Sequence, residues 1–238
     1  MRSAPPRGTR PSMTATCPPP PWHLRGTLHA SLWWVRADRL PSWTLPPGVR
    51  PLRLARRRAV VTFWVDYRPG GTLAYRELLV ALAVRRGWSV GACAVEAWVD
   101  DPRSLAGGRA LWGIPKHSAT FVFDRPAPAL LTTTVRTSRP APEHPRPAWP
   151  VAALHRPLVR LPGRLRVRAR LFQPALPERP YPCEVPLSLT GTAWLTRTRL
   201  RTAPGAPLDY LTGLRPLATC SLRDFRFTIA PAEPSRTA

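Results

Sequence analysis

Two common residue types are nearly missing from this chain of 238 residues. It contains no asparagine, and Lys116 is the only lysine among its 36 lysine and arginine residues. Lysine is among the commonest residues of ordinary proteins, and a chain of this length would carry roughly a dozen. A GC-rich coding bias, which replaces lysine wherever arginine is tolerated, fits the abundance of arginine, alanine and proline. The position at which lysine is kept is therefore informative.

Long apolar segments and paired cysteines are missing as well. No stretch approaches the roughly 18 consecutive apolar residues of a transmembrane helix, and the first 21 residues lack the apolar centre of a signal peptide. The four cysteines lie far apart, which argues against a disulfide framework or a zinc knuckle. We expect a protein of the cytoplasm with no membrane partner and no bound metal.

Negative charge is scarce, since 13 acidic residues face 36 basic ones and the net charge is +23. Such a balance is typical of nucleic-acid binders. The arginines are nevertheless spread through tails, loops and strand-like segments such as 164–170, and no helix-turn-helix, zinc-finger, RRM or KH pattern accompanies them. We favour a solvated surface shaped by coding bias over a dedicated nucleic-acid partner.

One domain is expected over residues 22–230, because the chain is 44% hydrophobic and contains 10 tryptophans. Residues 1–21 are predicted to be a disordered arm rich in proline and arginine, and 231–238 a flexible tail. The proline-rich stretch 139–150 is predicted to be a loop or an edge connection.

Strand patterns dominate this domain. Many short segments without intervening helical periodicity favour a mainly β protein with an antiparallel sheet that closes or folds over. The expected strands are 27–35, 59–67, 73–84, 90–99, 119–123, 130–137, 165–172, 191–200 and 225–229.

One short helix is predicted after residue 101. Asp101 can accept hydrogen bonds as the N-cap, and Pro102 suits the first helical position. The helix would continue to Leu111, weakened by two interior glycines, and Pro115 would stop it. Lys116 is therefore expected just beyond the helix, where the chain re-enters the sheet.

Two other chemical patterns are weak. Residues 87–91, Gly-Trp-Ser-Val-Gly, match the G-x-S-x-G expression of hydrolases, but strand patterns on both sides predict a hairpin turn rather than the required strand-to-helix turn. Cys17, His23 and His29 are possible metal ligands, yet no fourth ligand is near and structural zinc needs four. We expect neither a serine hydrolase nor a metal site.

Lys116 offers a chemistry that arginine cannot supply. A lysine amine that has lost its proton can attack a carbonyl carbon and form a Schiff base. Arginine stays protonated at physiological pH and cannot take this role. A chain that has exchanged almost every other lysine should keep one where the amine reacts.

The sequence around Lys116 resembles a known family. Residues 108–116, Gly-Arg-Ala-Leu-Trp-Gly-Ile-Pro-Lys, resemble the glycine-arginine and proline-lysine signature of the acetoacetate decarboxylase family. Tyr75-Arg76-Glu77 is similar to the family's Tyr-x-Glu element, and residues 22–25, Trp-His-Leu-Arg, are similar to its N-terminal arginine segment. The resemblance extends from about residue 18 to residue 229.

The resemblance implies a fold, a reaction and roles for residues. Lys116 would form the Schiff base, Glu77 would assist proton movement in the pocket, and Arg25 would hold the substrate carboxylate. The implied fold is a large antiparallel sheet closed into a cone-like barrel with a few short peripheral helices. The implied protein is a homo-oligomer that decarboxylates a small keto acid without any cofactor, and its lysine pKa must fall well below about 10.4.

The sequence also departs from this family at one position. Members commonly place a second lysine directly after the reactive one, whereas His117 stands here, so electrostatic lowering of the lysine pKa would be weaker and pH-dependent. Burial beside Trp112 could still lower that pKa, and we count His117 and Trp112 as candidate substrate-binding residues. Glu96 is a further carboxylate that could point inward.

Three alternatives stay open at this stage. The same lysine could serve an aldolase or dehydratase that acts on a 2-keto acid. The barrel could bind a small ligand without chemistry. The chain could also be a basic nucleic-acid binder.

Overall fold

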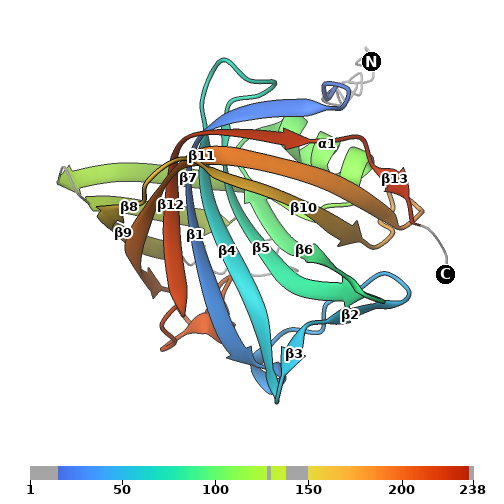
Figure 1. Ribbon diagram of the computed structural model, residues 1–238, viewed down its shortest axis with the longest axis horizontal. Helices are drawn as coiled ribbons and strands as arrows, with labels where there is room; N and C mark the ends of the chain where they lie inside the picture. The colour runs from blue at the N-terminus through green and yellow to red at the C-terminus, as the bar shows by residue number, and fades with distance from the viewer. Residues whose placement is uncertain (1–15, 128–129, 138–149, 236–238) are drawn as a thin grey trace, which may run out of the picture.

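The computed structural model of the protein describes residues 16–127, 130–137 and 150–235, and Figure 1 shows its strands wrapped into a ring. The strands are β1 (Trp22–Arg36), β2 (Val49–Pro51), β3 (Arg53–Leu54), β4 (Arg57–Tyr67), β5 (Tyr75–Arg86), β6 (Ser89–Val99), β7 (Lys116–Ala127), β8 (Leu130–Thr137), β9 (Pro150–Arg160), β10 (Leu165–Gln173), β11 (Cys183–Arg201), β12 (Ala218–Ile229) and β13 (Glu233–Pro234). The helices of this described part are α1 (Pro102–Trp112) and the short 3₁₀ turns η1 (Ala37–Arg39) and η2 (Asp209–Leu211).

Hydrogen-bonded neighbours close a ring through nine strands, in the order β6-β7-β8-β9-β11-β12-β1-β4-β5 and back to β6. β10 pairs with both β6 and β11 and so spans the ring. In Figure 1, β8 and β9 extend to one side, and β10 runs beside β6 on the other. The expected mainly β fold with a closed sheet is confirmed, although the ring is not an even barrel.

The sheet is mixed rather than wholly antiparallel. The pairs β6–β7 and β10–β6 are parallel, while the other strand pairs are antiparallel. The first exception has a local cause, because α1 returns the chain to the same end of the sheet before β7 begins, and such a crossover produces a parallel pair.

The predicted helix is present, and Asp101 caps it. Its Oδ1 accepts hydrogen bonds from the backbone N–H groups of Arg103 at 2.7 Å and Ser104 at 3.1 Å. The helix ends before Pro115, because Gly113 adopts the left-handed conformation (φ 64°) that closes helices.

Four strands of the described residues were not expected, namely β2, β3, β9 and β13, and β9 is the longest of them. Its prolines conceal the pattern, since proline cannot donate to a ladder. Pro157 lies where the register between β11 and β9 shifts, so the irregularity accommodates the missing donor. Of the expected loop 139–150, residues 139–149 lie outside the described residues.

The two ends of the chain differ from expectation where they are described. Residues 16–21 lie beside the domain, and the indole N–H of Trp22 donates to the carbonyl of Pro18 at 2.9 Å. In the segment expected to be a flexible tail, Glu233–Pro234 forms β13 and pairs with β11. Residues 1–15 and 236–238 lie outside the described residues.

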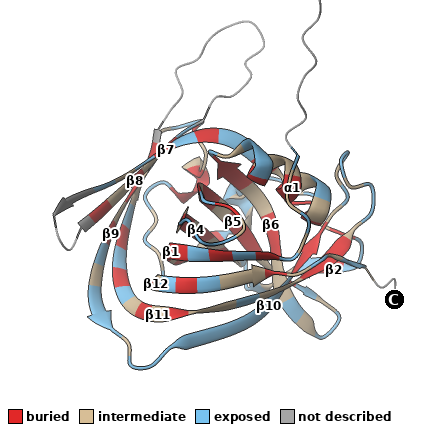
Figure 2. Ribbon diagram, turned by 90° about the horizontal axis from the view of Figure 1, so that it is seen from above, coloured by how far each residue is buried: buried red, intermediate tan, exposed pale blue. Residues whose placement is uncertain are grey.

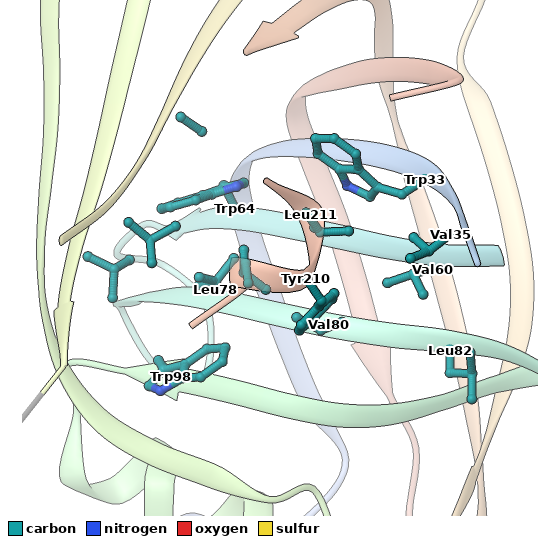
Figure 3. Packing of buried hydrophobic residues seen from close by; sticks show 14 of the residues in the cluster. Trp33, Val35, Val60, Trp64, Leu78, Val80, Leu82, Trp98, Tyr210 and Leu211 are labelled. Carbon is teal, nitrogen blue, oxygen red and sulfur yellow. The ribbon is translucent and has the colours of Figure 1, made fainter. Parts of the chain in front are cut away.

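Two apolar clusters lie on opposite faces of β5. Leu78, Val80 and Leu82 face the first cluster, which contains Trp33 and Trp64 (Figure 3). Tyr75 belongs to the second cluster, with residues such as Trp22, Trp112 and Phe225. β5 is thus buried on both faces, which explains its nearly continuous apolar sequence.

Burial alternates along parts of the ring but not along β10, where residues 165–170 are exposed and the next three are buried. In Figure 2, buried and exposed residues alternate along β12. Within the described ranges, no helix is long and apolar enough to cross a membrane.

Candidate active site

The end of α1 positions Lys116. The N–H of Gly113 donates to the carbonyl of Arg109 at 3.1 Å, and the N–H of Ile114 donates to the carbonyl of Gly108 at 3.0 Å. These bonds close the last turn of α1, so Pro115 begins an extended segment and Lys116 becomes the first residue of β7. The expected location just beyond the helix is confirmed.

Two glycines of α1 allow the helix to approach the site closely. A Cβ atom on Gly108 would lie 2.4 Å from Cδ and 2.6 Å from Cε of Lys116. A Cβ atom on Gly107 would lie 2.6 Å from the ring of Trp22. The glycines that weaken the helix in sequence terms therefore make room for the lysine and for a wall of the site.

The amine of Lys116 lies in a buried polar cluster. Nζ is 2.7 Å from Oε1 of Glu77, and it donates to Oγ of Ser104 at 2.9 Å and to the phenol oxygen of Tyr75 at 3.4 Å. The phenol of Tyr67 donates to Oε2 of Glu77 at 3.2 Å. Lys116 and Glu77 are only 4% and 3% exposed, so each depends on the other for charge compensation.

Burial and charge act in opposite directions on the pKa of Lys116. Burial lowers the pKa, but the Glu77 carboxylate and Tyr75 raise it more, and the pKa lies above its ordinary value. The expectation of a lowered pKa is therefore wrong for this resting arrangement, because a carboxylate lies 2.7 Å from the amine.

The two phenols stay protonated at neutral pH. Burial, and then the charge of Glu77, raises the pKa of Tyr75 to about 12 and that of Tyr67 well above its ordinary range. Both hydroxyl groups can therefore donate hydrogen bonds at the site.

Lys116 and Glu77 face a cavity of about 470 Å³. Tyr67 and Tyr75 lie at the same polar end. The remaining walls are mostly apolar and come from β1, β4, β5, β6, β10, β11 and β12, with residues including Leu24, Leu28, Phe63, Val65, Leu79, Ala81, Leu187, Leu189, Phe225, Phe227 and Ile229.

Trp112, a predicted binding residue, also lines this cavity. Its indole N–H donates to the carbonyl of Ala230 at 2.8 Å, and its ring meets that of Trp22 edge to face at 4.7 Å between centroids. These contacts fix the indole as a rigid wall beside the lysine.

Arg25 and His117 do not reach the cavity. Arg25 is exposed on the face of β1 opposite to Leu24, and its guanidinium lies against Gly70. His117 is exposed on the outer face of β7, 6.3 Å from the ring of Trp98, and partial burial and then Arg109 lower its pKa. Both placements follow from strand alternation, because neighbours of inward residues point outward.

Glu96 belongs to the other apolar cluster. Its carboxylate accepts hydrogen bonds from the indole of Trp43 and the phenol of Tyr210, both at 3.1 Å. Burial raises its pKa, and it is not among the cavity-lining residues. The carboxylate therefore joins two loops to the sheet rather than contacting a ligand at Lys116.

Sequence reasoning missed Ser104 and Tyr67. Ser104 lies one helical turn before Gly108, so the spacing of four residues could have placed it over the lysine. Tyr67 is opposite Tyr75 in the β4–β5 pair. The Pro-Gly-Gly sequence at residues 69–71, which favours a turn between those strands, could have brought the two phenols together.

The weak chemical patterns also have clear locations. Gly87, in the left-handed region (φ 55°), lies in the predicted hairpin between β5 and β6, so Ser89 is not on a strand-to-helix turn. Buried His29 stacks on His155 at 4.4 Å, while His23 is exposed. The described part of the chain contains no group of three or more His, Cys, Asp or Glu residues that could hold a metal.

Comparisons with known proteins agree with this geometry. The sequence profile of acetoacetate decarboxylase (ADC) matches residues 4–144. A search of curated protein sequences finds no match. The crystal structure of acetoacetate decarboxylase from Legionella pneumophila has a TM-score of 0.69 and 16% identity, covering 98% of this chain and 92% of that one.

Two further solved structures are similar. The enduracididine biosynthesis enzyme MppR complexed with pyruvate has a TM-score of 0.61 and 20% identity, covering 97% of this chain and 98% of that one. An acetoacetate decarboxylase-like enzyme from Sphingomonas wittichii RW1 has a TM-score of 0.58 and 16% identity, covering 92% and 94%. At these identities, the structural likeness establishes the fold.

Proposed function

This chain belongs to the acetoacetate decarboxylase family, and from that premise we propose that it decarboxylates a β-keto acid through a Schiff base on Lys116. The observation that carries the proposal is the position of the only lysine. Its amine is buried at 2.7 Å from Glu77 and faces a cavity large enough for a substrate. Arginine at this position could not form an imine.

The first step is loss of a proton from Lys116. The 2.7 Å contact lets the proton pass from the ammonium to the Glu77 carboxylate, which leaves a neutral amine beside a neutral carboxylic acid. This exchange keeps the net charge of the buried site unchanged, and an unpaired charge at this depth would be costly. The free amine then attacks the keto carbon of the substrate.

Glu77 next returns its proton. The hydroxyl of the tetrahedral adduct leaves as water, and a protonated imine forms on Lys116. The electron pair of the bond to the carboxylate moves to the imine, carbon dioxide leaves, and an enamine results. A proton added to the α-carbon and a water added to the imine release the ketone and restore the amine.

The apolar walls favour the step that releases carbon dioxide. A localised carboxylate charge is poorly solvated beside groups such as Trp112 and Ile114, whereas carbon dioxide and the enamine are neutral. Ser104 and Tyr75 keep Nζ oriented towards the cavity while its charge changes. No metal or organic cofactor is required by these steps.

A second candidate uses the same imine on a 2-keto acid, as an aldolase or dehydratase. It is supported by the likeness to the MppR structure, which is complexed with pyruvate. The pyruvate named for the similar MppR structure gives a 2-keto acid to test here.

Borohydride trapping tests the proposal. We expect acetoacetate with borohydride to add the mass of a reduced imine to the peptide that contains Lys116, and to inactivate the enzyme. Lys116→Arg is the matched control, and its peptide that contains residue 116 should carry no adduct. Failure of acetoacetate, longer 3-keto acids and pyruvate to modify Lys116 would contradict both candidates.

We also propose that the protein acts in the cytoplasm as a homo-oligomer. The four cysteines are free thiols, as expected in a reducing compartment. Light scattering on the purified protein tests the oligomeric state, and a monomer at micromolar concentration would contradict it.

A further inference from the structure

The cavity at Lys116 has two chemically different ends. Along β5, the side chains of Tyr75, Glu77, Leu79 and Ala81 alternate onto the cavity face. The first two lie at the reactive end, and the last two are apolar. At about 3.3 Å per residue, Ala81 lies roughly 13 Å beyond Glu77 along this row, so the apolar part of the cavity, called the channel below, continues beyond the reacting atoms.

The neighbouring strands repeat this gradient. Tyr67 is opposite Tyr75, and Phe63 is opposite Leu79 in the β4–β5 register. Across the ring, Leu189 is opposite Phe227. The polar groups at Lys116 therefore converge at one end. The walls of the other end are mostly aliphatic and aromatic, apart from Arg168 and Arg170 of β10 at the opening.

The channel walls leave apolar surface uncovered. Five large apolar side chains on its walls are only half-buried, namely Phe63, Leu79, Leu187, Leu189 and Phe227. Water finds few hydrogen-bond partners on such a surface, so binding of an apolar ligand that covers the surface is favoured. The channel opens beside β10, where Val90 and Val167 are 63% and 38% exposed.

The volume exceeds what acetoacetate needs. A dry cavity of about 150 Å³ holds benzene, with six carbon atoms. By the same ratio the cavity of about 470 Å³ accepts roughly 19 non-hydrogen atoms, whereas acetoacetate has seven.

From the proposed Schiff-base function, on which this step rests, we propose that the substrate is a keto acid with an apolar tail of several carbons. The keto carbon lies at Lys116, and the tail extends along Leu79 and Ala81 towards β10. The tail and the carboxylate-bearing group are separate substituents of the keto carbon, so the tail can extend along Leu79 and Ala81 and away from Glu77.

A chain-length series tests the inference. Borohydride trapping is measured with 3-oxobutanoate, 3-oxohexanoate, 3-oxooctanoate and 3-oxodecanoate. We expect the half-saturating concentration to fall roughly fourfold per methylene, the factor that corresponds to about 0.8 kcal/mol for each buried CH₂. Equal half-saturating concentrations across the series would overturn the inference and leave the Schiff-base function standing.

Variants connect the effect to the channel. Ala81→Phe fills the channel from β5, and we expect it to reduce the preference for 3-oxodecanoate over 3-oxobutanoate at least tenfold. Ala169→Phe, on an exposed part of β10 at the opening, should act in the same direction if Ala81→Phe does not fold. Ala218→Phe, exposed on β12 away from the cavity lining, is the matched control and should keep the preference.

Octanoate separates the inference from the proposed function, because it has the tail but no keto group. Calorimetry should detect octanoate binding that 3-oxodecanoate displaces and that Ala81→Phe weakens. If octanoate binds but no keto acid is trapped, the channel for an apolar tail stands and the Schiff-base proposal falls. If keto acids are trapped and octanoate does not bind, the tail inference falls.

Discussion

At the scale of single residues, the pair of Lys116 and Glu77 determines what the site can do. The two side chains compensate each other in the interior, and the same contact raises the pKa of the amine that must become neutral. In the proposed mechanism, the amine therefore loses its proton within the pair rather than to solvent.

Replacing Glu77 should reverse the direction of the lysine pKa shift. In Glu77→Gln the largest cause that raises the pKa is gone, burial remains, and the pKa of Lys116 should fall below its ordinary value of about 10.4. Because the chain has one lysine, lysine labelled with ¹³C gives a single side-chain signal whose pH titration reports this pKa. Glu96→Gln is the control. Glu96 accepts hydrogen bonds from Trp43 and Tyr210 rather than from Lys116, so this variant should leave the titration of Lys116 unchanged. A pKa that rises in Glu77→Gln would refute this account.

Gly108 should tolerate no side chain. In Gly108→Ala the new methyl group would lie 2.4 Å from Cδ of Lys116, so the lysine must move. We expect Schiff-base trapping to fall at least tenfold, although alanine favours the helix by about 1 kcal/mol. Ala110→Leu, on the exposed side of the same helix, is the control and should trap normally. Normal trapping by Gly108→Ala would show that the close approach is unimportant.

At the scale of elements, α1 and the start of β7 act together. The Asp101 cap fixes where the helix begins, Gly113 fixes where it ends, and these two limits place Ser104 and Lys116 side by side. The helix is therefore a positioning element for the amine.

Loss of the cap should destabilise this element. Asp101→Ala removes the acceptor for two backbone N–H groups and should cost about 1 kcal/mol of unfolding free energy. Urea unfolding measures the change, and Asp101→Asn should recover most of it. Equal stability of Asp101→Ala and the parent would exclude a capping role.

The sequence predicted the helix, most strands and the location of Lys116, because each depends on local signals such as Asp101, Pro102 and alternation. It did not predict β9, whose prolines obscure its pattern, or the parallel pair β6–β7, which depends on the crossover. Arg25 and His117 were assigned from the resemblance, but both occupy strand positions whose side chains point away from the cavity. The face on which a strand residue lies depends on the register of strand pairing, and a single sequence does not display that pairing.

At the scale of the whole molecule, a second buried polar cluster crosses the ring. His29 and His155 stack at 4.4 Å between strands far apart in sequence, and Nδ1 of His155 is 2.9 Å from the hydroxyl of Thr198. Burial, and then His29, lowers the pKa of His155 well below its ordinary value. The folded protein therefore keeps this imidazole uncharged.

Acidification should weaken the fold through this cluster. Since the folded pKa of His155 lies below the unfolded value of about 6.5, its contribution to stability is present above pH 6.5 and is lost as the pH falls, by up to about 1.4 kcal/mol per pH unit. Urea midpoints between pH 7.5 and 5 measure the slope. His155→Gln should reduce it, whereas His23→Gln, at an exposed site, should not. Identical slopes in His155→Gln and the parent would assign the acid sensitivity elsewhere.

The position of β5 between two interiors has a consequence for how such proteins diverge. Leu78, Val80 and Leu82 pack in the tryptophan-rich cluster, whereas Leu79 and Ala81 line the cavity proposed to bind the substrate. Selection for stability and selection for substrate therefore act on alternate residues of one strand. Relatives of this chain should vary along β5 with a period of two, so that new substrates are acquired at every second residue while the residues between them are retained.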